Sequence, residues 1–441
     1  AEMEISKTLI KNARIFPGVE DGQAKPVIEA GCALIKGNRF AYVGPEEACP
    51  AGRTEKVIDA GGRLLMPALV NAHTHSAMTL LRGVGGEKPL EVWLREHIFP
   101  LEERLVAQQA RAGVALAMLE YLACGVTTIN DMYMFPEETV KVVMEAGGRA
   151  MISNACVDFG KGEAQLADAL AFHRDYHGAE EGRIRASVSV HAEYTTTPEL
   201  VKKLVRATEG LDNIQHLHLS ETQQEAAACR QRHGMSPVQY FHHLGLFNGP
   251  AVAAHCVAVD EEDMALLAQD GVRVAHAVIS NLKLGSGIAP VPEMLSRGIP
   301  LTLGTDGAAS NDNLDLWEEI KLTALLHKGA GRDATLISPA QVLEAATLGG
   351  ARALGFDGLG LICEGWLADC VLMDLSLPNT LPAHDIPATL VYAAGSRNVS
   401  MTMSAGRVLY QDGEYLSLDE EKIKTRARQS AGELLGRDFS V

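Results

Sequence analysis

Apolar runs alternate with amphipathic stretches from about residue 63 to residue 356. Each apolar run is short, ends in polar or small residues, and precedes a longer stretch with helical spacing. Parallel strands that helices cover on both faces have this continuously apolar character. Eight runs fit the description, at residues 63–73, 126–131, 149–157, 184–193, 213–221, 251–257, 272–280 and 300–307.

The intervening stretches have the period of α-helices. Residues 107–125 and 260–271 carry apolar side chains at helical spacing, and both end in glycine. Eight strand–helix repeats predict an α/β fold, a parallel (β/α)8 TIM barrel, which a single domain of about 250 residues or more can form.

The two ends of the chain have a different texture, with short β-type runs between glycine, proline and charged turns. These runs lie at residues 4–16, 31–44, 55–67, 367–376, 388–394 and 399–415. We therefore predict that both termini pair into one small β-sandwich domain. Its N-terminal part is residues 1–66, the catalytic barrel is 67–357, and its C-terminal part with a terminal helix is 358–441.

Composition narrows the class of protein. The 441 residues are 47% hydrophobic and carry a formal net charge of -17. This negative charge disfavours binding to nucleic acid or to an anionic membrane through a broad basic face. No apolar run reaches the ~18 residues of a membrane span, and the first residues lack the apolar core of a signal peptide. We expect a soluble cytoplasmic protein with a small neutral or cationic substrate, and a homo-oligomer is left open.

The eight cysteines are scattered and form no CxxC pair. This spacing favours reduced packing thiols over a zinc ribbon or a disulfide scaffold.

Polar residues gather where the predicted strands end. His73 and His75 are two residues apart, so in a strand both rings project from one face. Other strands end in further polar residues: His191 in the fourth, His218 and Glu221 in the fifth, His255 in the sixth and Asp306 in the eighth. The carboxyl ends of barrel strands form one mouth, where active sites lie. These side chains are therefore expected to converge.

Histidines that converge with a carboxylate suit a divalent metal ion. A single histidine is more often a hydrogen-bonded or surface ring, as we expect for those at 173, 177, 242 and 243. Imidazoles and a carboxylate from separate strands instead match Zn²⁺ best, with Fe²⁺ or Mn²⁺ open. The fourth strand has no lysine at its tip to bridge a second metal, so one ion is favoured.

Three residues have roles that the spacing suggests. His216 shares a face with His218 but lies deeper, where it packs or forms a hydrogen bond. Glu221 follows the strand end and can move a proton between water and substrate, although a helix N-terminus also favours a carboxylate. Asp306 can bind the metal and accept a proton from water, or serve as a turn residue before its glycine.

The motifs resemble the amidohydrolase superfamily, and within it the 5-methylthioadenosine/S-adenosylhomocysteine deaminases, with similarity also to the triazine hydrolase group. The matching stretches are "LMPALVNAHTHSAM", "FPLEERL", "HLHLSET", "AHCV", "ISNLKLGSGIAPVPEML" and "GTDGAASNDNLDLWEEIKL". The resemblance covers nearly the whole chain. By position it implies that one metal ion is held by His73, His75, His218 and Asp306.

The resemblance also implies an activity, the hydrolytic deamination of adenine nucleosides such as methylthioadenosine, S-adenosylhomocysteine, adenosine or 5'-deoxyadenosine. Water would attack C6 and give up a proton to Asp306, while Glu221 protonates N1 and His255 orients the attacking oxygen. Glu102 and His191 match positions that contact the ribose and tail, so the substrate would meet Glu102, His191, Glu221 and Asp306.

Three alternatives stay open at this stage. A triazine chlorohydrolase and a guanine or pterin deaminase use the same scaffold, and a catalytically silent barrel used for assembly is a third. Asn154 stands where the deaminases commonly have an arginine, which would bind a carboxylate on the substrate tail. The 5' substituent of the substrate is therefore also open.

Overall fold

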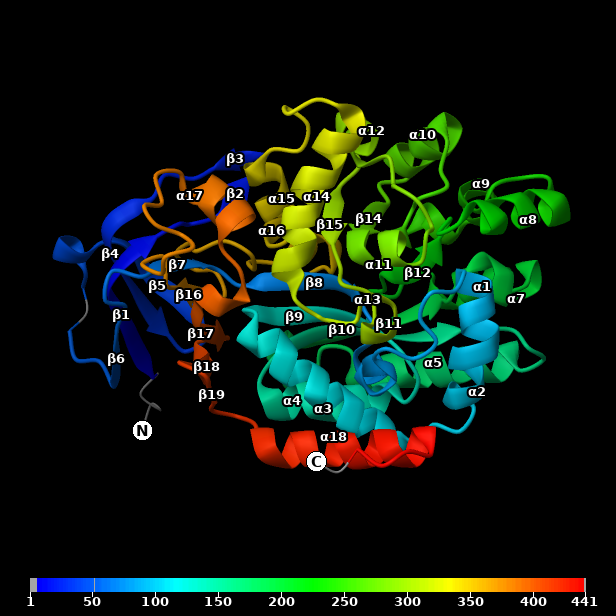
Figure 1. Cartoon of the computed structure of the whole chain (residues 1–441), viewed down its shortest axis with the longest axis horizontal. Helices are drawn as coiled ribbons and strands as arrows, with labels where there is room; N and C mark the ends of the chain where they lie inside the picture. The colour runs from blue at the N-terminus through cyan, green and yellow to red at the C-terminus, as the bar shows by residue number, and fades with distance from the viewer. Residues whose placement is uncertain (1–5, 51, 440–441) are drawn as a thin grey trace.

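The computed structural model describes residues 6–50 and 52–439. A barrel and a smaller sheet lie side by side, and the two ends of the chain both contribute to the smaller sheet (Figure 1). The first two residues of the predicted strand 4–16 lie outside the described residues, and its remainder forms β1 (Lys7–Ile15). No helix within the described part is long and apolar enough to cross a membrane.

The barrel consists of two four-stranded parallel sheets, in the orders β11-β10-β9-β8 and β12-β13-β14-β15. The two seams are closed by backbone hydrogen bonds from His218 N to His191 O at 2.9 Å and from Asp306 N to His73 O at 2.9 Å. The predicted (β/α)8 fold is thus confirmed. Its strands are β8 (Leu69–Thr74), β9 (Val126–Met132), β10 (Arg149–Cys156), β11 (Ile184–Val190), β12 (Gln215–Leu219), β13 (Ala251–His255), β14 (Arg273–His276) and β15 (Leu301–Leu303).

Helices surround the barrel strands (Figure 1). Several begin at side chains that accept a hydrogen bond from a free backbone N–H, as Thr197, Thr222 and Asp260 do. The longer barrel helices are α3 (Ala107–Ala123), α4 (Pro136–Ala146), α5 (Gly162–Tyr176), α7 (Pro198–Thr208), α8 (Gln223–His233), α9 (Pro237–His243), α10 (Glu261–Gln269), α14 (Leu316–Gly331) and α15 (Pro339–Ala345). Shorter ones are α1 (Leu90–Trp93), α2 (Phe99–Glu102), α11 (Val278–Lys283), α12 (Val291–Ser296), α13 (Ala308–Asn311) and α16 (Leu348–Ala353).

The smaller sheet has nine strands in the order β19-β18-β17-β16-β7-β1-β4-β5, with β6 paired to β1. The start of its edge strand β5 also contacts the segment that precedes β16, because Phe40 N donates to Trp366 O and Ala368 N donates to Asn38 O. The remaining strands are β4 (Ile28–Lys36), β5 (Arg39–Pro45), β6 (Lys56–Asp59), β7 (Leu64–Pro67), β16 (Cys370–Met373), β17 (Val399–Ser404), β18 (Arg407–Gln411) and β19 (Glu414–Tyr415), and a separate hairpin holds β2 (Val19–Glu20) and β3 (Gln23–Ala24). The C-terminal helix α18 (Glu420–Leu435) runs along the barrel beside α3.

Two sequence-based strand predictions are corrected by the structure. The run 63–73 forms two strands, with β7 in the smaller sheet and β8 in the barrel, because Pro67 has no N–H with which to extend a ladder. The run 388–394 is helical, with α17 (Ile386–Ala388) continuing into one turn at Thr389–Ala393. Asp385 caps that helix by accepting from Ala388 N at 3.0 Å, and burial of its apolar residues explains the strand-like pattern.

Candidate active site

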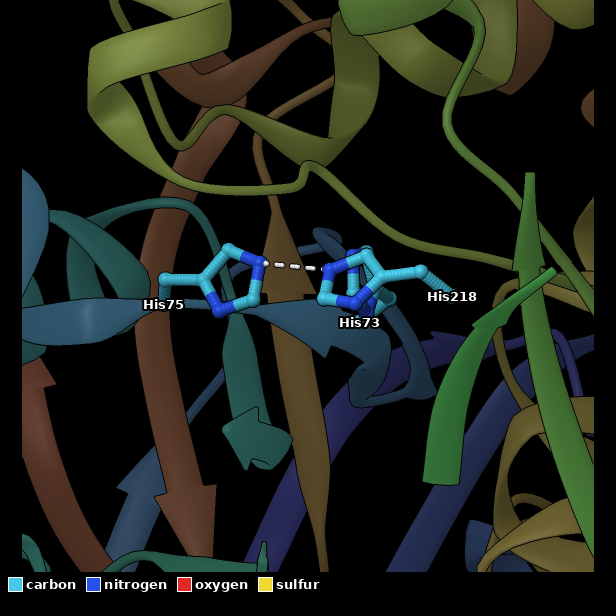
Figure 2. Close-up of side chains that lie close together, drawn as sticks. All are labelled: His73, His75 and His218. Carbon is cyan, nitrogen blue, oxygen red and sulfur yellow. Dashed lines mark hydrogen bonds between the residues drawn. The ribbon is translucent and has the colours of Figure 1, made fainter. Parts of the chain in front are cut away.

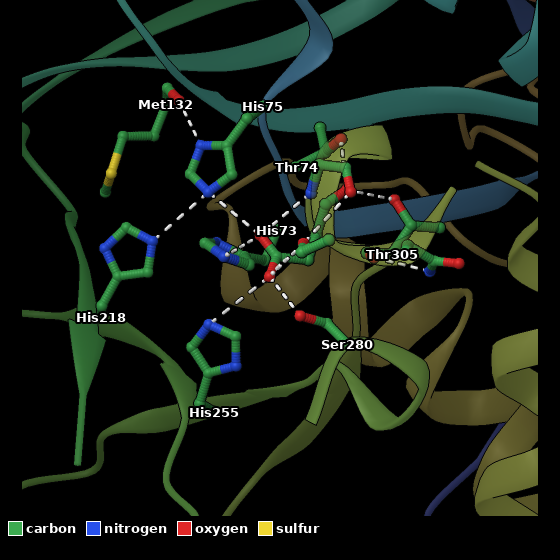
Figure 3. A network of polar contacts seen from close by, with 12 residues as sticks. His73, Thr74, His75, Met132, His218, His255, Ser280 and Thr305 are labelled. Atoms are coloured by element: carbon green, nitrogen blue, oxygen red, sulfur yellow. Dashed lines mark hydrogen bonds and ion pairs between the residues drawn. The ribbon is translucent and has the colours of Figure 1, made fainter. Parts of the chain in front are cut away.

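The mouth of the barrel gathers the predicted polar residues. His73 lies on β8 and His75 directly follows it, while His218 lies on β12, His255 ends β13 and Asp306 follows β15. Figure 3 shows the four imidazole rings pointing toward one another. All five residues are buried except His75, whose side chain is 11% exposed. Side chains from four strands therefore meet in the buried interior of the barrel mouth.

The spacing of the donor atoms matches a four-coordinate metal site. His73 Nε2 and His75 Nε2 lie 3.2 Å and 3.1 Å from Asp306 Oδ1, and His75 Nε2 lies 3.3 Å from His218 Nε2. Ligands at 2.0–2.1 Å from a tetrahedral Zn²⁺ are about 3.3 Å apart. These three distances are therefore those expected around one small cation, and the nitrogens of His73, His75 and His218 all lie within 4.8 Å of one another.

The outer ring nitrogens determine which atoms face the centre. His75 Nδ1 donates to the carbonyl of Met132 at 2.5 Å, and His218 Nδ1 donates to that of His191 at 3.0 Å. Both Nε2 atoms then carry lone pairs in the neutral rings and face each other (Figure 2). Two lone pairs this close repel unless a proton or a cation lies between them, so a cation at the centre would stabilise this arrangement.

His73 is oriented by a second histidine, which lies deeper in the barrel. Its Nδ1 lies 2.8 Å from His216 Nε2, and His216 Nδ1 lies 3.2 Å from the hydroxyl of Ser153. This chain leaves His73 Nε2 buried, facing Asp306 Oδ1 at 3.2 Å without the geometry of a full hydrogen bond. A metal would satisfy that nitrogen, and support of a ligand by an outer hydrogen bond is usual for metal-binding histidines.

The electrostatics of the cluster follow from burial and from Asp306. Burial lowers the pKa of His73 to about 4. Burial also opposes protonation of His75, but the hydrogen bond and charge of Asp306 outweigh it and raise the pKa of His75 to about 9. The Asp306 pKa is well below its usual value, since bonds to His73 and His75 overcome the effect of burial. The ionised Asp306 therefore favours a cation beside it, and a metal ion can supply that charge in place of a proton on His75.

Asp306 is held in a strained backbone conformation, with φ at +62°. Its Oδ2 accepts from Ser280 Oγ at 2.7 Å and from Ser310 Oγ at 3.0 Å. Gly304 allows the close approach to β8, because a Cβ there would lie 2.7 Å from the backbone of His73. The two serines were not singled out in the sequence, although Ser280 lies in the quoted "ISNLKL" stretch.

Glu221 and His255 lie beside this donor cluster. Glu221 Oε2 is 3.6 Å from His255 Nε2, which is itself 3.8 Å from Asp306 Oδ2. His255 Nδ1 donates to Asn281 Oδ1 at 2.8 Å, so its Nε2 faces the two carboxylates. Burial, with the charge of Asp306, raises the pKa of Glu221 against the opposing effect of His255. Such a carboxyl gains and loses a proton nearer neutral pH than one in water.

Glu102 and His191 flank the cluster on other sides. Glu102, at the end of α2, accepts a hydrogen bond from Tyr133, and burial raises its pKa despite that bond. Tyr133 follows β9, and its ring lies 6.4 Å from that of His75. The ring of His191 lies 4.6 Å from that of His218, and burial lowers its pKa to about 4, so it is neutral. The sequence did not single out Tyr133, whose role depends on a contact between separate loops.

Residues 64–409 match the family model described as the amidohydrolase family. The chain belongs to the amidohydrolase family. The family resemblance and the barrel fold that the sequence predicted are thereby confirmed.

Relatives within the amidohydrolase family cover nearly the whole chain. A 5-methylthioadenosine/S-adenosylhomocysteine deaminase of Dictyoglomus thermophilum is 42% identical over 87% of this chain and 90% of its own length. A 5'-deoxyadenosine deaminase of Methanothermobacter thermautotrophicus is 40% identical over 93% of this chain and 96% of its own. An adenosine deaminase from Xanthomonas campestris, solved with bound zinc, has a TM-score of 0.93 at 34% identity and covers 98% of this chain and 99% of that one.

Proposed function

We propose that this amidohydrolase removes the 6-amino group of an adenine nucleoside by hydrolysis, with one divalent metal ion, for which Zn²⁺ fits best. The observation that carries the proposal is the convergence of His75 Nε2 and His218 Nε2, 3.3 Å apart, beside Asp306, with Glu221 Oε2 3.6 Å from His255. The similar proteins named as deaminases of adenine nucleosides, one of them solved with zinc, support both parts.

The residues that would hold the metal are His73, His75, His218 and Asp306, the set with matching donor spacing. When bound, a divalent cation supplies the Lewis acidity that lets water act as a nucleophile near neutral pH. Neutral imidazoles and one carboxylate suit Zn²⁺, and Fe²⁺ or Mn²⁺ can occupy a similar set.

The side chains around that position divide the proton transfers. Asp306 accepts a proton from the water that attacks C6, since its carboxylate stays ionised. Glu221 gives a proton to N1 of the ring, which its raised pKa favours. His255 lies within 4 Å of both carboxylates and orients the attacking oxygen. The proton held by Asp306 then passes to the amino group, which leaves as ammonia, and the hydroxyl at C6 returns a proton to Glu221 to give the inosine analogue.

Glu102 and His191 are the proposed substrate contacts outside the reacting ring. A carboxylate can accept hydrogen bonds from two vicinal hydroxyls, which suits Glu102 for the ribose. Asn154, which stands where similar deaminases have an arginine, is half-buried on β10. Its amide offers no guanidinium to pair with the carboxylate of a homocysteine tail.

The test of the proposed function is a panel of substrates offered to the zinc-loaded protein. We expect ammonia release with 5'-methylthioadenosine, adenosine and 5'-deoxyadenosine, and a kcat/KM for S-adenosylhomocysteine that is lower than for the uncharged nucleosides. Guanine, a pterin and a chlorotriazine serve as controls. Turnover of a control compound together with none of the nucleosides would contradict the proposal.

Glu102→Ala tests whether a ribose is recognised. We expect kcat/KM for adenosine to fall by about 10-fold or more, since two hydroxyls lose their acceptor. Turnover of free adenine, which has no hydroxyl to lose, should change much less. Tyr133→Phe is the matched variant, because it removes one hydrogen bond to Glu102 while the carboxylate stays in place. Equal losses on adenosine and adenine would exclude a ribose contact at Glu102.

A further inference from the structure

The turn that carries Glu221 is strained. Strand β12 ends at Leu219, and Ser220 has φ at +49°, a left-handed conformation that favours glycine. Thr222 then caps α8 by accepting from Glu225 N at 3.1 Å. Two residues therefore reverse the chain between strand and helix, and they determine where the Glu221 side chain points.

Two groups of hydrogen bonds hold this turn from opposite sides. The carbonyl of Ser220 accepts from Val257 N at 3.0 Å and from Ala258 N at 2.8 Å, in the loop that follows His255. On the other side, Glu225 Oε2 accepts from Glu221 N at 2.6 Å, and the same carboxyl accepts from the backbone N–H of Ser220. One side chain thus binds two successive amides of the turn.

Glu225 is an unusual group for this position. It is 6% exposed, and its second oxygen, Oε1, has no hydrogen-bond partner among the described residues. Burial, with the neighbouring charge of Glu221, raises the pKa of Glu225 to about 8. This shift favours the neutral carboxyl, which holds the turn without a second negative charge beside Glu221.

We propose that Glu225 is a positioning residue, whose carboxyl clamps the Ser220–Glu221 turn and so sets the distance of the Glu221 carboxylate from His255. This inference rests on the role given to Glu221 in the proposed deamination. The alternative is that Glu225 only caps α8. Asp263 offers a matched control, since it is buried at the corresponding position of α10 and accepts from Asp260 N at 3.2 Å rather than from an amide of the Ser220–Glu221 turn.

The kinetic test compares Glu225→Ala, Glu225→Gln and Asp263→Ala, all zinc-loaded. Because a misplacement of about 1 Å costs up to about 10²-fold, we expect kcat on adenosine to fall by about 10-fold to 10²-fold in Glu225→Ala, with KM and metal content nearly unchanged. Glu225→Gln keeps an oxygen acceptor and should recover most of the loss. Asp263→Ala should lower Tm and leave kcat alone. An unchanged kcat in Glu225→Ala overturns the proposal.

A crystal structure of Glu225→Ala gives a readout that does not depend on activity. The Glu221 carboxylate should move away from its 3.6 Å approach to His255 Nε2, while the imidazoles of the donor cluster stay in place. An unmoved carboxylate overturns the inference, whereas a wild-type protein that deaminates no nucleoside overturns the proposed function instead. Should Glu225→Ala not fold, Glu225→Asp, whose carboxyl is one methylene too short to reach the turn, gives the same comparison.

Discussion

Replacing His73 or His218 with alanine should abolish both metal retention and ammonia release. Each substitution removes an imidazole whose Nε2 faces the centre of the site, where His73 Nε2 lies 3.2 Å from Asp306 Oδ1 and His218 Nε2 lies 3.3 Å from His75 Nε2. Changes to outer partners of metal ligands already cost about 10–100-fold in affinity, so loss of a ligand should cost more. The measurement is metal content per chain after loading and dialysis, with kcat on the same sample.

A histidine outside the site provides the control for this prediction. His243 is exposed at the end of α9, and His243→Ala should keep full metal content and full turnover. Stoichiometric metal in His73→Ala or His218→Ala would contradict the assignment of that residue as a ligand.

Glu221→Gln should keep the metal and the fold but lower kcat by about 10²-fold or more, the lower end of typical general acid–base contributions. The amide can still donate a hydrogen bond to the ring nitrogen, so substrate affinity should change less than kcat. It cannot transfer a proton. The measurement is kcat and KM for adenosine, with metal content determined on the same preparation.

The competing view of Glu221 makes a different prediction. If the Glu221 carboxylate only interacts with the dipole at the N-terminus of α8, replacing it should lower stability by about 1 kcal/mol or less and leave turnover nearly normal. Thermal unfolding of Glu221→Gln therefore belongs beside the kinetics. A small drop in Tm together with wild-type kcat would remove Glu221 from the mechanism.

Much of the fold could be predicted because strands and helices leave local signals. Barrel strands such as β9 and β13 are buried along their whole length, and continuous burial requires the continuous apolar runs that the sequence contains. The prediction for 388–394 was wrong because a short apolar run has the same composition whether it forms a strand or a buried helical turn.

The sequence by itself determined the barrel, the family and which residue types stand at the strand ends. Strands alternate with helices along the chain, and residues two positions apart on one strand share a face, so these features can be read locally. Their roles as ligands, acid and base stay predictions until the variants above are measured. Only the tertiary structure decided which atoms meet. The carbonyls of Met132 and His191 orient the rings of His75 and His218, Tyr133 reaches Glu102, and Glu225 reaches back to the turn. These partners lie on separate loops or across a turn, so their contacts depend on how the barrel closes rather than on any local pattern.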